Sequence, residues 1–150
     1  MRTTLLFLFT ICLSLRLSAT TFIVTSVSNQ GAGTLREAIS NADNGDIIRF
    51  NPSLISSGSK TIELSSEITI EKDLTIIGLY NGQDTLFVSG RNQNRIFIVD
   101  LTSSPTGTMT IDSMALIKGR GLDYGGAIYC DGDHFNIRNC LFRDNYAKEL

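Results

Sequence analysis

The sequence predicts an all-β protein, a parallel β-helix (solenoid) with a short N-terminal capping helix. Three observations predict this fold: many short apolar segments bounded by turn residues, connections too short for crossover helices, and one apolar pattern that recurs along the chain. The composition suits many tight turns, because the chain holds 13 Gly and no Trp. We divide it into residues 1–19, 20–45 and 46–150.

Residues 1–19 have the pattern of a cleaved signal peptide. Arg2 gives a positive start, residues 5–15 are apolar and uncharged, and Leu17-Ser18-Ala19 supplies small residues before the cleavage point. This run is about half of the roughly 20 residues that a membrane anchor needs. We therefore expect export to the extracellular space or the outer membrane surface, and no transmembrane segment in the mature chain.

The mature chain is mildly acidic. Processing removes Arg2 and Arg16 but no acid, so the formal net charge changes from −2 to −4. No basic cluster remains, and we expect no nucleic acid partner.

Residues 20–45 are expected to form a strand at 22–24 and then the capping helix. Thr34 and Glu37 have capping-box spacing, in which the Thr hydroxyl accepts from the third helical amide and the Glu carboxylate from the Thr34 amide. Asn44-Gly45 is expected to end the helix after about three turns. Such a short helix needs a surface to cover, and we expect that surface to be the first rung of the solenoid. Its apolar face contains Leu35, Ala38, Ile39 and Ala42.

Residues 46–150 are predicted to form the rungs. The expected strands are 47–50, 61–64, 68–70, 74–77, 86–88, 96–99, 109–111, 127–129 and 135–137. Sandwich, barrel and solenoid are all compatible with such strands, and the repeat favours the solenoid.

The repeat relates three segments of the chain. Met109, Ile111, Met114 and Leu116 match Phe135, Ile137, Cys140 and Phe142 at an offset of 26 residues, and Leu74, Ile76 and Leu79 match the first three at an offset of 35. The alternation changes phase at residues 112–113 and 138–139, which predicts a strand, a sharp bend and a second strand. The columns Ile76–Ile111–Ile137 and Leu79–Met114–Cys140 are expected inside.

Two motifs then resemble a known family. "GTLREAI" at 33–39 resembles exported bacterial right-handed parallel β-helix proteins that carry an N-terminal Leu-Arg-Glu-Ala motif. "GGAI" at 125–128 and Phe142-Arg143-Asp144-Asn145 resemble the Gly-Gly-Ala-Ile and Phe-x-x-Asn repeat of the polymorphic outer membrane proteins. The resemblance implies a secreted or outer-surface passenger of a Gram-negative bacterium, often concerned with adhesion.

The sequence also departs from that family, which repeats its motif many times and usually ends in a barrel or sorting domain. One copy is present here, so we expect the C-terminal rung to be continued by missing sequence or covered by a partner. The motif residues also have structural explanations. Gly125-Gly126 permits a turn with positive φ, Phe142 fills the interior, and Asn145 bonds turn amides.

The search for chemistry yields one weak candidate. Asp131, Asp133 and His134 crowd the turn "CDGDH", where they either bind a cation or form an ordinary solvated surface. The turns 81–84 and 121–123 carry further acids, but no column places these acids beside Asp131. His134 is the only His and no strained Gly-x-Ser-x-Gly turn accompanies it; no zinc spacing or phosphate-binding loop is present either. We assign no catalytic, cofactor-binding or metal-binding residue and no cofactor.

Cys130 and Cys140 are the thiols that remain after processing. By analogy with Ile96 and Ile98, we expect Ile128 and Cys130 to face the core. A bridge depends on how the strands bend, and we expect unpaired thiols.

The expected function is that of a non-catalytic module for adhesion or surface display, with a glycan or a surface protein as its partner. The alternatives are a pectate-lyase-like, polysaccharide-degrading enzyme and a purely structural passenger segment.

Overall fold

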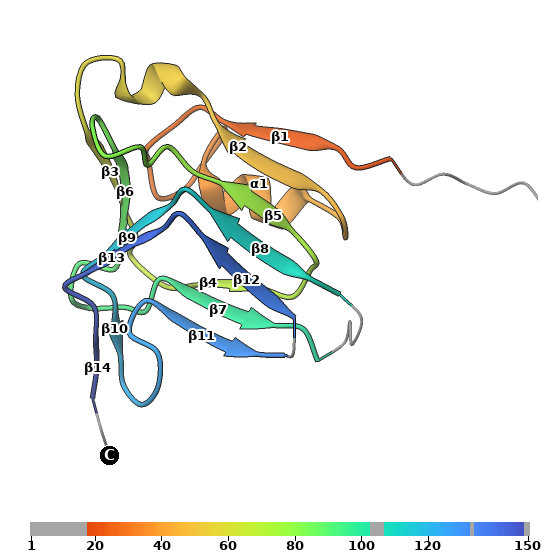
Figure 1. Ribbon diagram of the computed structural model, residues 1–150, viewed down its shortest axis with the longest axis vertical. Coiled ribbons are helices and arrows are strands. Elements are labelled where there is room, and N and C mark those ends of the chain that lie inside the picture. The colour runs from red at the N-terminus through yellow and green to blue at the C-terminus, as the bar shows by residue number, and fades with distance from the viewer. Residues whose placement is uncertain (1–17, 103–106, 133, 149–150) are drawn as a thin grey trace, which may run out of the picture.

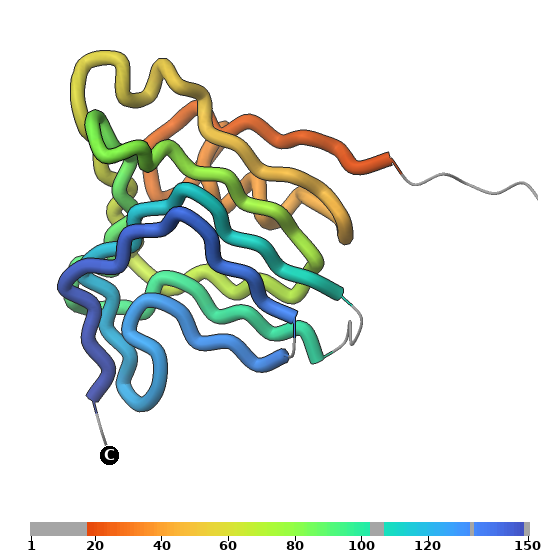
Figure 2. The backbone as a smooth tube through the Cα atoms, in the orientation of Figure 1, coloured from red at the N-terminus to blue at the C-terminus, as the bar shows by residue number. Residues whose placement is uncertain are grey.

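The chain forms a β-solenoid of about five turns, and all of its paired strands are parallel. The computed structural model describes residues 18–102, 107–132 and 134–148. The coils lie beside one another along the long axis, from β1 at one end to the last coil near the C-terminus (Figure 1; Figure 2). The predicted fold class is therefore confirmed.

Three sheets form the walls of the solenoid. Sheet A contains β1 (Thr21–Val24), β2 (Ile47–Phe50), β5 (Thr75–Ile77), β8 (Met109–Asp112) and β12 (Phe135–Arg138). Sheet B contains β3 (Lys60–Glu63), β6 (Leu86–Ser89), β9 (Ala115–Ile117) and β13 (Leu141–Arg143). Sheet C contains β4 (Ile68–Ile70), β7 (Phe97–Asp100) and β11 (Ile128–Asp131). A short extra pair joins β10 (Arg120–Gly121) to β14 (Tyr146–Ala147), and a 3-10 helix, η1 (Pro52–Ile55), follows β2.

The interior consists of columns of residues one strand spacing, about 4.8 Å, apart. Ile76 pairs with Ile111 and Ile111 with Ile137, so the register of the first expected column is confirmed, but Ile137 lies in the last described coil and is 47% exposed. Met114 is buried, and Leu79 and Cys140 pack against the same core, in agreement with the second column. Phe142 faces inward opposite Leu116, but it lies in the last described coil and is 43% exposed.

At each predicted change of phase, one residue between sheets A and B adopts the left-handed backbone conformation. Ser113 has φ of 51° and Asn139 has φ of 50°. One residue in this conformation turns the chain sharply and shifts which side chains point inward. It also separates β8 from β9 and β12 from β13. The repeat predicted a second strand after each bend but did not give the bounds of these strands.

Helix α1 (Leu35–Asn41) covers the first end of the interior, next to β1 (Figure 1). Its expected apolar face is confirmed, since Leu35, Ala38 and Ile39 are buried. The Thr34 hydroxyl accepts from the Glu37 amide at 3.3 Å, as in a capping box. The donor that we predicted for the Glu37 carboxylate, the Thr34 amide, was wrong. The Glu37 carboxylate accepts from the Gly33 amide at 2.6 Å, while the Thr34 amide donates to the Gly31 carbonyl.

The helix is also shorter than expected. It ends at Asn41, and Ala42 is extended at φ −71° and ψ 152°, so Asn44-Gly45 does not form its C-terminus. The ammonium of Lys72 donates to the carbonyls of Ile39, Ser40 and Ala42. A side chain from the next coil therefore satisfies carbonyl groups that a left-handed cap would otherwise bond.

The inward-facing residues of sheet C differ from the expectation that Ile98 faces the core. Ile128 and Cys130 do face inward, but they pair with Phe97 and Val99, whereas Ile98 lies opposite Tyr129 on the outer side. Residues 96–99 are all apolar, so alternation could not reveal which of them point inward. Both thiols are free, as expected, and burial raises the pKa of each.

The expected signal peptide lies almost entirely outside the described residues, which begin at Ser18. Within the described part of the chain, no helix has the length and apolar character needed to span a bilayer.

Candidate ligand-binding groove

A polar groove of about 350 Å³ runs along the corner between sheets B and C. Three successive coils supply its lining from the segments that precede β4, β7 and β11. We name it the Arg95 groove and define it by Ser66, Glu67, Gln93, Asn94, Arg95, Arg120, Gly121, Leu122 and Asp123.

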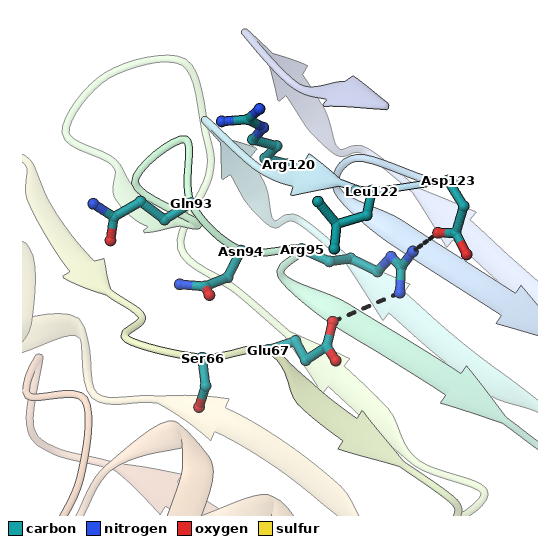
Figure 3. A pocket seen from close by; sticks show the side chains of 9 residues that line it. Ser66, Glu67, Gln93, Asn94, Arg95, Arg120, Leu122 and Asp123 are labelled. Carbon is teal, nitrogen blue, oxygen red and sulfur yellow. Dashed lines mark hydrogen bonds and ion pairs between the residues drawn. The ribbon is translucent and has the colours of Figure 1, made fainter. Parts of the chain in front are cut away.

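Arg95 organises this groove. Its side chain is 11% exposed and lies between two carboxylates, as Figure 3 shows. One guanidinium nitrogen is 2.7 Å from the Asp123 carboxylate and another is 3.6 Å from that of Glu67. Because each carboxylate belongs to a different neighbouring coil, Arg95 links three coils by side-chain contacts.

The same guanidinium holds the loop that follows β10. Its Nε donates to the Gly125 carbonyl at 2.9 Å, and Nη2 donates to the Tyr124 carbonyl at 2.6 Å. The guanidinium also lies 5.2 Å from the centre of the Tyr129 ring, a cation–π distance. Loop 122–125 is therefore fixed at its base by one side chain.

The lining carries two carboxylates, those of Glu67 and Asp123, and two guanidinium groups, those of Arg95 and Arg120. The Tyr124 amide, followed by the Arg95 guanidinium, holds the pKa of Asp123 below its usual range. Asp123 is thus an anion at neutral pH, and Glu67 and Asp123 both lie against Arg95. Arg120 forms no ion pair with the residues that the structure describes.

We call the exposed side chains of Leu122, which lines the groove, and of Tyr124 on the same loop the apolar rim. Leu122 is 73% exposed and Tyr124 is 68% exposed, and both are carried by loop 122–125. Tyr146 of β14 is also exposed and lies opposite Arg120. Large exposed side chains of this kind, next to a polar hollow, are typical of binding surfaces.

The GGAI and Phe-x-x-Asn motifs build the support of this rim. Gly125 has φ of 59°, and a Cβ on Gly126 would lie about 2.5 Å from the backbone of Tyr146. The Asn145 side chain accepts from the Gly119 amide at 2.7 Å and donates to the Leu116 carbonyl at 2.9 Å. The structural explanation is confirmed for Gly125 and Asn145, whereas Gly126 is required by its close approach to Tyr146 and not by a positive φ.

The cation candidate receives no support from the described residues. Asp131 and His134 are exposed, and Asp133 lies outside the described residues. Asp131 pairs with Asp100, an acid that no sequence column had placed beside it. No group of three or more His, Cys, Asp or Glu side chains in the described ranges is arranged to hold a metal ion.

The two other acidic turns separate in space. Asp123 joins the Arg95 groove, whereas Asn81, Gln83 and Asp84 line a second groove, which also includes Pro52 and Leu79.

Sequence analysis missed Arg95 and Glu67. A signal was present, because Glu67, Arg95 and Asp123 follow one another at a constant offset of 28 residues. This spacing differs from the offsets of 26 and 35 residues in the apolar repeat, so that repeat did not align the three side chains. Comparison of the chain with protein families, curated proteins and solved structures finds no match.

Proposed function

We propose that the protein is an exported, non-catalytic module that attaches to a ligand through the side wall of its solenoid. The Arg95 groove carries this proposal, because it is an accessible polar hollow whose side chains are held in place before any ligand binds. The signal-peptide pattern and the resemblance to polymorphic outer membrane proteins support an outer-surface or secreted location. Adhesion or surface display is the role that unites these features.

The groove favours binding over catalysis. General acid catalysis at neutral pH needs a group whose pKa is raised toward neutrality, and the pKa of Asp123 moves in the opposite direction. Arg95 donates to loop carbonyls and lies against two carboxylates, so its guanidinium is engaged in structural contacts. These side chains hold one another in place and leave no unengaged acid–base pair.

An attachment assay tests the proposal. Beads coated with the processed chain are allowed to settle on mucin-coated, polysaccharide-coated and bare surfaces, and detachment in shear flow is measured. We expect retention on at least one coated surface and none by beads coated with the denatured chain. Retention on none of them would favour the purely structural passenger.

The enzyme alternative has a separate measurement. Polygalacturonate is incubated with the chain and calcium, and unsaturated products are followed by ultraviolet absorbance. Calcium-dependent product formation that is lost in Asp131→Ala would replace the proposal with a polysaccharide lyase.

A further inference from the structure

We infer that the Arg95 groove is a binding site for a neutral oligosaccharide. This inference rests on the proposed attachment function and names the chemical class of its ligand. The observations that carry it are the polarity of the lining, its fixed geometry, its balanced charge and its apolar rim.

The lining offers hydrogen-bond donors and acceptors side by side. Carboxylate oxygens accept, guanidinium groups donate, and the amides of Gln93 and Asn94 do both. A sugar hydroxyl both donates and accepts, so neighbouring hydroxyls can bond to such a mixed surface. Sites for most drug-like ligands are mainly apolar, and this groove is not.

The fixed geometry lowers the cost of binding. Arg95 is largely buried and contacts Glu67, Asp123 and two loop carbonyls, so these groups are ordered before a ligand arrives. Ordering a flexible side chain on binding costs roughly 0.5–1.5 kcal/mol, and the preformed network avoids most of that cost. Gln93 and Arg120, which point away from the Arg95–Asp123 pair in Figure 3, are left to reach the ligand.

The charge of the lining favours a neutral polymer over an acidic one. Two carboxylates are matched by two guanidinium groups, so the groove provides no excess positive charge for a polyuronate. A uronate carboxylate near Arg95 would also approach the fixed anions at Glu67 and Asp123. Neutral hydroxyls meet no such repulsion.

The rim provides the apolar contact that a sugar ring needs. Leu122 and the Tyr124 ring are exposed on the same short loop, whose base is held by Arg95. The C–H face of a pyranose packs on a Tyr ring or a Leu side chain while its hydroxyls remain free to bond at the ring's edge. The polar lining and the apolar rim of the groove therefore match the hydroxyl groups and the C–H face of a sugar.

The test measures binding of cellohexaose, maltohexaose, mannohexaose and polygalacturonate to the processed chain by titration calorimetry and amide NMR. We expect at least one neutral hexasaccharide to bind and to shift amide resonances of residues 93–95 and 120–124. Arg120→Ala and Tyr124→Ala should each weaken binding about tenfold, because each removes one good contact. Arg138→Ala is the matched control: Arg138 is also exposed and on a strand, but it belongs to sheet A, outside the groove lining.

Several outcomes would overturn the inference. Binding of polygalacturonate alone, no binding of any hexasaccharide, or an equal loss in Arg120→Ala and Arg138→Ala would each exclude a neutral-sugar site in the groove. If beads attach to mucin-coated surfaces and no hexasaccharide competes, the ligand class is wrong while the attachment function stands. Failure of both assays would remove the proposed function as well.

Discussion

Replacing Ile111 by Ala tests the register of the solenoid most directly. Ile111 is 0% exposed and stacks between Ile76 and Ile137 in sheet A. The substitution removes three carbons; at about 0.8 kcal/mol for each buried methylene, plus the cavity that remains, the expected loss of stability is about 3 kcal/mol. Its neighbour Thr110 points outward, so Thr110→Ala should cost less than about 1 kcal/mol.

Urea unfolding followed by far-ultraviolet circular dichroism measures both variants. Ile111→Ala should lower the unfolding midpoint clearly without changing the slope, because the surface exposed on unfolding is almost the same. Thr110→Ala should keep nearly the wild-type midpoint. Equal losses in the two variants, or a larger loss for Thr110→Ala, would refute the assignment of inward and outward positions in sheet A.

Substitutions at three further positions test local features. Ser113→Gly should leave the melting temperature unchanged or higher, whereas Ser113→Val should cost about 1–2 kcal/mol, since φ is 51° there. Asn145→Ala should lose about 1–3 kcal/mol and speed hydrogen exchange of the Gly119 amide, which donates to that side chain. The Asp43 amide is the main cause of the lowered pKa of Asp46, so the charged form stabilises the fold above the unfolded pKa of about 3.9, and this stabilisation is lost as pH falls through the folded pKa. Urea midpoints at about pH 7 and below about pH 4 should therefore differ less for Asp46→Asn than for the wild type.

The solenoid was predictable because the residues that repeat along the sequence are the apolar residues that face its interior. Alternating apolar residues fix which side chains point inward, and a shift of phase reveals a bend even where no Gly or Pro marks it. Ser113 and Asn139 illustrate this, because both adopt the left-handed conformation at the place where the alternation changes.

The errors have identifiable physical causes. The Ala42 carbonyl at the end of the helix accepts from Lys72, thirty residues further along the chain, and no local pattern announces such a long-range contact. The inward residues of β7 were misassigned because an unbroken apolar run has no alternation to follow.

The groove was harder to predict than the core. Most of its defining residues, including Glu67, Arg95 and Asp123, lie between strands, where residue types vary and no periodicity is required. Asp123 was noticed as a loop acid, but its partner Arg95 acquires a role only once three coils are stacked.

If the proposed ligand binds in the Arg95 groove, the bridge made by Arg95 makes its binding and the stacking of the coils interdependent. A solenoid under tension along its axis loads the interfaces between successive coils in series, and separating any of the three bridged coils would dismantle the groove. A ligand that occupies the assembled groove must, by linkage, resist that separation by the free energy with which it binds. An attachment site built across coils would thus reinforce the part of the molecule that carries the load.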